Sequence, residues 1–147
     1  MARKLIFKYR SDGSMMPMYV YCKVYNDGTL EAGDGKIYED KDEHHATKKL
    51  SRNTIRDIER IIDRNYKIFE IDKIEDPGPI ILDGTTETLY FSDERQSRTF
   101  KIDNLDLWGE YKKEPGALET PNYDLVVNTY KEIRKILIKN GLSPEHF

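Results

Sequence analysis

The clearest pattern in this chain is the segment MYVYCKVYNDGTLEAG, residues 18–33. Its first half alternates as a β-strand does, with two sets of side chains on opposite faces: Val20, Cys22 and Val24 on one, and Tyr19, Tyr21 and Tyr25 on the other. Asn26-Asp27-Gly28 follows, and these residue types tolerate the positive φ of a tight turn. Thr29 to Ala32 then returns as the partner strand, so the segment predicts a β-hairpin.

The hairpin strand has two apolar faces, and the sequence leaves open which one the helices cover. If they cover the tyrosines, the rings belong to the core and their hydroxyls reach its edge, which is the arrangement that we favour. If they cover Val20, Cys22 and Val24 instead, the tyrosines form a patch that is open to a peptide, a carbohydrate or stacked bases. The tyrosines at positions 19, 21 and 25 are therefore candidate binding residues.

The residues on either side of the hairpin extend the sheet. Upstream, Leu5, Phe7 and Tyr9 alternate with polar neighbours as in another strand. Downstream, a glycine-rich segment at 33–35 ends the hairpin, and residues 36–39 predict one further short strand. The polar residues Asp40 to His45 predict a loop.

A helix is predicted from Ser51, its N-cap, to about Tyr66, with Leu50 placed to pack on Ile55. Four arginines recur every fourth residue along one side of this helix: Arg52, Arg56, Arg60 and Arg64. At about 100° per residue the isoleucines fall on the opposite side, so the row should face water. Because like charges four residues apart repel, either neighbouring acids or an anionic partner must compensate the row, and we favour the acids Asp57, Glu59 and Asp63.

The second half of the chain repeats the hairpin-then-helix order. A Pro-Gly-Pro break at 77–79 precedes a predicted strand at Ile80 to Leu82, and a second hairpin follows between about residues 88 and 102. A second helix begins at Thr120-Pro121 and ends at Gly141. Its buried stripe is predicted to be Tyr123, Val126, Tyr130, Ile133 and Leu137. The sequence therefore predicts an α+β domain spanning 1–147, with an antiparallel sheet of about five to six strands and two amphipathic helices on one face.

The first half of the chain resembles small bacterial domains of unknown function. The likeness is carried by the Asp-Gly-Thr hairpin at 27–29, followed after a loop by the Leu-Ser-capped helix LSRNTIRDIERII at 50–62. The resemblance implies no activity, and no functional residue is transferred from it.

Charge and cysteine content restrict the possible functions. The 147 residues include 24 Lys and Arg against 27 Asp and Glu, a formal net charge of −3, which provides no overall basic field for nucleic acid. Cys22 is the only cysteine, so an intramolecular disulfide and a multi-cysteine zinc site are excluded. The N-terminal apolar run is too short for a signal-peptide core or a membrane span, and we expect a cytoplasmic protein.

Three candidate catalytic or metal-binding groups are weaker than their structural alternatives. The run EDKDEHH at 39–45 offers carboxylates and imidazoles, but the adjacent His44 and His45 cannot easily face one ion, so we interpret the run as a solvated acidic loop. Asp83, Glu110 and Lys112 are similar to the metal-binding acids and the lysine of one nuclease class, yet Glu110 follows a loop-like stretch. Burial would make Cys22 a poor nucleophile.

We therefore expect no catalytic residues, no cofactor and no metal site. The favoured function is that of a non-enzymatic binding domain, of accessory or immunity type, that recognises a protein partner. One alternative is a metal-dependent hydrolase that uses Asp83, Glu110 and Lys112 or the two histidines. The other is a nucleic-acid binder that uses the arginine row of the first helix, which predicts steep salt dependence.

Overall fold

The computed structural model describes residues 3–13, 17–75, 84–105, 115 and 119–143 of the chain. Its elements in chain order are β1 (Leu5–Gly13), β2 (Met18–Tyr25), β3 (Thr29–Lys36), β4 (His44–Lys49), α1 (Arg52–Arg64), the short 3-10 helix η1 (Tyr66–Glu70), β5 (Thr85–Ser92), β6 (Ser97–Asp103) and α3 (Pro121–Lys139).

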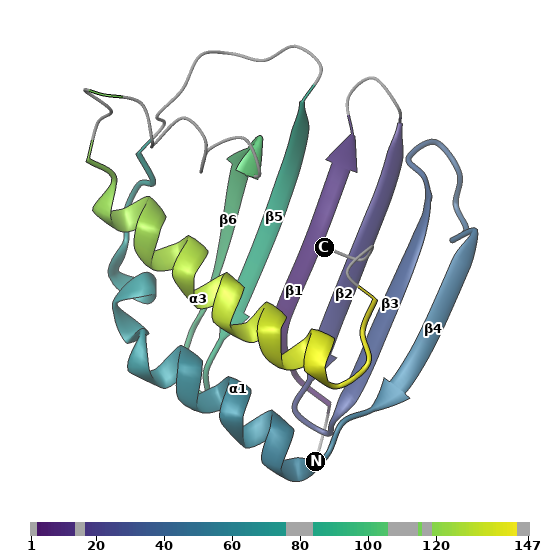
Figure 1. Cartoon of the computed structure of the whole chain (residues 1–147), viewed down its shortest axis with the longest axis horizontal. Coiled ribbons are helices and arrows are strands. Elements are labelled where there is room, and N and C mark those ends of the chain that lie inside the picture. Colours follow the sequence, from purple (N-terminus) through teal and green to yellow (C-terminus); the bar gives the residue numbers. More distant parts are fainter. Residues whose placement is uncertain (1–2, 14–16, 76–83, 106–114, 116–118, 144–147) are drawn as a thin grey trace.

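The strands form one six-stranded sheet in the order β4-β3-β2-β1-β5-β6, and every neighbouring pair is antiparallel. The first four strands are sheet neighbours in chain order, whereas β5 joins the free side of β1 from a distant part of the sequence. Both helices lie side by side on the same face of this sheet (Figure 1). The predicted α+β fold class is confirmed.

The helices cover the face of β2 that carries valine and cysteine. Cys22 and Val24 are completely buried, together with Ile58 of α1 and Val126 and Ile133 of α3. These side chains belong to one continuous hydrophobic core, to which Tyr19 and Tyr21 do not belong. The expectation that the helices cover the tyrosines is therefore wrong.

The hairpin between β2 and β3 turns as predicted. Gly28 has a φ of +95°, a conformation that side chains with a Cβ rarely adopt. The backbone N–H of Thr29 donates to the Asp27 carboxylate at 2.9 Å, and the N–H of Gly28 donates to the carbonyl of Tyr25 at 3.0 Å. The Gly28 carbonyl also accepts from the N–H of Leu50 at 2.7 Å, so the turn fixes the start of α1 against the sheet.

Both helices begin where the sequence predicts. Ser51 caps α1, because its hydroxyl accepts from the N–H of Thr54 at 3.1 Å. The helix ends at Arg64, and η1 takes up the residues that follow. In α3 the predicted stripe from Tyr123 to Leu137 is buried, and Gly141, with a φ of +99°, follows the last turn.

Three predictions in the first half are wrong. The glycine-rich segment at 33–35 does not end the hairpin but lies within β3. Residues 36–39 do not form a separate strand, because β3 continues to Lys36 and a turn follows. His44, predicted to lie in a loop, is instead the first residue of the edge strand β4, whose six residues are all exposed. The strand predicted at 80–82 lies outside the described residues.

Candidate functional site

The face of the sheet opposite the helices, which we call the open face, carries polar side chains in cross-strand rows. One row runs through His45, Gly33, Tyr21, Arg10, Thr88 and Lys101. The neighbouring row runs through Thr47, Glu31, Lys23, Lys8, Tyr90 and Thr99. Each row joins residues that are far apart in the sequence, so the register of the sheet assembles this surface.

Two of the three candidate tyrosines lie flat on glycines of β3. A Cβ added to Gly33 would come within 2.7 Å of the Tyr21 hydroxyl oxygen, and one added to Gly35 would come equally close to that of Tyr19. Tyr19 and Tyr21 are each only 7% exposed, although neither α1 nor α3 covers them. Because Gly33 and Gly35 have no side chains, the two rings can pack directly against the backbone of β3.

Asp42, in the turn between β3 and β4, holds both rings. Its carboxylate accepts hydrogen bonds from the hydroxyls of Tyr19 and Tyr21, the latter at 2.5 Å. The hydrogen bond to Asp42 raises the pKa of Tyr19 to about 12, and burial together with the same carboxylate raises the pKa of Tyr21. Since Arg10 also lies 4.4 Å from the centre of the Tyr19 ring, these rings offer little surface for stacking a ligand.

The most unusual feature of the open face is a pair of lysines on the inner strands. Lys8 and Lys23 are direct cross-strand neighbours in the β1–β2 register, an arrangement in which like charges destabilise a sheet. Lys101 lies on β6 in the adjacent row. We call Lys8, Lys23 and Lys101 the lysine patch.

Three carboxylates that neighbour the lysine patch in the strand register have other partners, including Glu31, which lies directly opposite Lys23. Glu31 pairs with Arg3 at 3.5 Å, and Asp12 pairs with Arg10 at 2.9 Å. Asp103 accepts a hydrogen bond from Thr86 at 2.8 Å. Among the described residues, none of the three lysines forms an ion pair.

The groups around Lys8 act mainly against its charged form. Burial of the side chain lowers the pKa of Lys8, and the neighbouring charges of Lys23 and Arg10 lower it further. The opposing influence of Asp12 is the smallest of these effects. A nearby anion would reverse this balance, because an opposite charge favours the protonated amine.

The arginine row on α1 faces solvent as predicted. All four arginines are exposed. Arg60 pairs with Asp57 at 3.5 Å within the helix, and Arg64 pairs with Glu132 of α3. Arg52 and Arg56 form no ion pair with any residue that the structure describes. Ion pairs with described residues thus compensate two of the four arginines, Arg60 and Arg64.

The two histidines point in opposite directions, because adjacent residues of a strand face opposite sides of a sheet. His44 Nδ1 lies 2.8 Å from the Asp34 carboxylate, and this contact raises the pKa of His44. One ligand atom each from Asp34, Glu43 and His44 lie within 4.8 Å of one another. Glu43 is also paired with Lys36 at 3.6 Å, so ion pairs and hydrogen bonds account for the contacts of these three groups.

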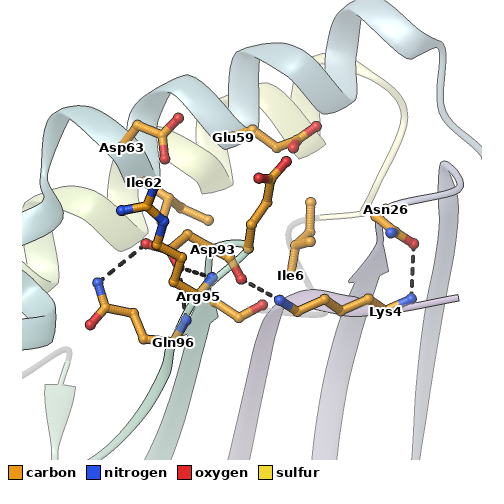
Figure 2. Close-up of a pocket in the computed structure, with 11 residues that line it drawn as sticks. Lys4, Ile6, Asn26, Glu59, Ile62, Asp63, Asp93, Arg95 and Gln96 are labelled. Atoms are coloured by element: carbon orange, nitrogen blue, oxygen red, sulfur yellow. Dashed lines mark hydrogen bonds between the residues drawn. The ribbon is translucent and has the colours of Figure 1, made fainter. Parts of the chain in front are cut away.

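A cavity of about 460 Å³ lies between α1 and the turn that joins β5 to β6 (Figure 2). Ile6 and Ile62 contribute its apolar lining, while Glu59 and Asp63 extend from the helix. Burial raises the pKa of Glu59, and the charges of Asp63 and Glu94 add to this effect. The cavity therefore contains carboxylates that repel one another.

The same cavity offers no nucleophile among its described lining residues. Ser92 donates its hydroxyl to the carbonyl of Leu5 at 2.5 Å, and Lys4 donates its amine to the carbonyl of Asp93. Asp93 itself accepts the N–H groups of Arg95 and Gln96, which fixes the turn. These polar groups are thus occupied in holding the turn and the start of β1 together.

Sequence reasoning missed Glu87, a carboxylate that is only 1% exposed on the helix side of β5. It accepts hydrogen bonds from Ser11 at 3.3 Å, from the hydroxyl of Thr85, and from the N–H of Leu105 at 3.3 Å. The available signal was its position, because residue 87 shares its strand face with Leu89 and Phe91. The contacts identify it as a structural anchor for the end of β6.

Cys22 is expected to be unreactive towards a thiol reagent in the folded protein. Its side chain is fully buried, and burial raises the pKa of its thiol to about 12, so almost no thiolate exists at neutral pH. Labelling with a colourless disulfide reagent should be slow until urea is added. Rapid stoichiometric labelling of the native protein would contradict the placement of this residue.

The alternative hydrolase residues Asp83, Glu110 and Lys112 lie outside the described residues. Comparison with protein-family models and with the curated proteins finds no match to this chain. Within the described part of the chain, no helix has the length and apolar character needed to cross a membrane. In the part of the chain that the structure describes, the fold defines an α+β domain in which α1 and α3 cover the same face of the sheet.

Proposed function

We propose that this protein is a non-enzymatic interaction domain that binds a protein partner through the open face of its sheet. The observation that carries the proposal is the placement of α1 and α3 on one side of the sheet, while Lys8 and Lys23 lie opposite each other on the inner strands of the other side. Such a surface costs stability in the free protein. A partner that supplies the missing opposite charge removes that cost.

The alternatives have weaker support. The histidines are separated by the sheet, and the groups around the α1 cavity are engaged in structural hydrogen bonds. The arginine row, the basis for the nucleic-acid alternative, has two of its four members in ion pairs. The open face instead carries three lysines, on β1, β2 and β6, that form no ion pair with another described residue.

A steric block on the open face tests the proposal without changing charge. Thr88 lies half-buried in the row between Arg10 and Lys101, so Thr88→Trp should cover the surface while adding only an aromatic ring to a strand that accepts such residues. The parent chain should capture a partner protein from an extract of cells that naturally express the parent chain. Thr88→Trp should fail to capture that partner. Capture should be measured by quantitative mass spectrometry of the bound fraction.

Arg56→Glu with Arg60→Glu provides the matched control on the helix side. Because exposed ion pairs contribute at most about 1 kcal/mol each, this double variant should change the free energy of unfolding only modestly. It should capture the same partner as the parent. The proposal fails if the parent captures no partner, or if the arginine variant loses a partner that Thr88→Trp retains.

A further inference from the structure

We infer that the lysine patch is a docking site for an acidic segment of a partner protein. This inference rests on the proposed function and specifies the ligand of the same face. Its basis is charge complementarity: Lys8 and Lys23 lie opposite each other without an ion-pair partner among the described residues, and Lys101 extends the positive charge to β6. Carboxylates of a partner are the missing counter-ions.

Packing restricts the side chains of Lys8 and Lys23 before a ligand binds. Lys23 lies 5.2 Å from the centre of the Tyr21 ring, and that ring is fixed on Gly33 by Asp42. Lys8 is half-buried on the inner strand β1, with Tyr90 as its neighbour on β5. Since an inner-strand side chain of this kind has limited freedom, less entropy is lost when the amines bind an anion.

The size and surroundings of the lysine patch favour an acidic protein segment over a nucleic acid. A nucleic-acid site gains its affinity by neutralising a continuous track of phosphates. Here the positive region is bounded at the Gly13 end of β1 by Asp12 and Asp103, which are cross-strand partners of Thr86. These acids would repel a phosphate chain that continued past the patch, whereas a short acidic peptide segment can end before them.

The test uses an octaglutamate peptide titrated into the isotopically labelled protein and followed by NMR. Amides of Lys8, Lys23 and Lys101 should shift, and affinity should fall as salt is raised. Lys8→Gln with Lys23→Gln should weaken binding by about tenfold or more, and this variant should fold because it removes a repulsion. The matched control, Lys131→Gln with Lys135→Gln on the exposed side of α3, should bind as the parent does.

Each other outcome overturns the inference. It fails if octaglutamate does not bind, if the shifts map to α1 or α3, or if the lysine variant binds as tightly as the parent. A single-stranded oligonucleotide that binds the patch more tightly than octaglutamate would replace the acidic segment with a nucleic acid. If Thr88→Trp loses a cellular partner that the lysine variant keeps, the inference fails while the proposed function stands.

Discussion

Gly28→Val is expected to destabilise the protein by roughly 3–5 kcal/mol, because it combines backbone strain with a steric clash. At a φ of +95° a β-branched side chain is strongly disfavoured. A Cβ at this position would also lie 2.7 Å from the carbonyl oxygen of Leu50, which is backbone and cannot swing away. Urea unfolding followed by circular dichroism measures the loss.

His44→Ala is the comparison for this substitution. Gly28 lies in the turn before β3 and His44 lies on β4, which pairs with β3, but only Gly28 has a backbone conformation that restricts the residue type. His44 is exposed, and replacing it with alanine removes a single contact with Asp34, so this substitution should lower the stability only slightly. Equal melting temperatures for the two variants would show that the turn at Asp27-Gly28 does not determine the fold.

Glu87→Ala is expected to lower the free energy of unfolding by about 2–4 kcal/mol, because buried donors lose their acceptor. The N–H of Leu105 and the hydroxyls of Ser11 and Thr85 all donate to this carboxylate. Glu87→Gln keeps an acceptor oxygen and should lose less. Chemical denaturation of both variants provides the comparison.

Glu94→Ala is the control for the removal of an acid, because Glu94 is exposed in the turn after β5. A change there should stay within about 0.5 kcal/mol. If Glu87→Ala were as stable as Glu94→Ala, the buried carboxylate would contribute nothing to the anchoring of β6.

The sequence predicts the elements whose side chains alternate strongly or whose ends are capped. The hairpin at Asp27-Gly28, the N-cap at Ser51 and the buried stripe of α3 all follow from local chemistry, and the structure confirms them. In each case the signal lies within a few residues, so no knowledge of distant contacts is needed.

Strand β4 could not be predicted because it has no apolar face. Its six residues, HHATKK, are all exposed, and hydrogen bonds to β3 at the edge of the sheet define it rather than burial. Hydrophobic alternation is the principal sequence signal for a strand, and here it is absent. The strand can be inferred only after β3 is seen to offer a free edge.

The covered face of β2 was predicted wrongly for a related reason. Both faces of the strand are apolar, and pattern alone cannot choose between them. The useful signal lies on the neighbouring strand, where Gly33 and Gly35 face Tyr21 and Tyr19. Glycines opposite aromatic residues indicate rings that lie on the sheet and need no helix to bury them.

The lysine patch also could not be found from the sequence. Lys8, Lys23 and Lys101 are far apart in the chain, and the pairing of β1 with β5 brings the last of them near the others. No local motif marks these residues. Their candidate role depends on the register of three strand pairs and on the engagement of the surrounding acids.

The most direct test of the open face as the contact surface is lysine footprinting of the protein with and without its captured partner. Acetylation is read out residue by residue with mass spectrometry. We expect Lys8, Lys23 and Lys101 to become protected in the complex, while Lys131 and Lys135 on α3 react as before. Protection of the α3 lysines, with unchanged labelling of the lysine patch, would contradict it.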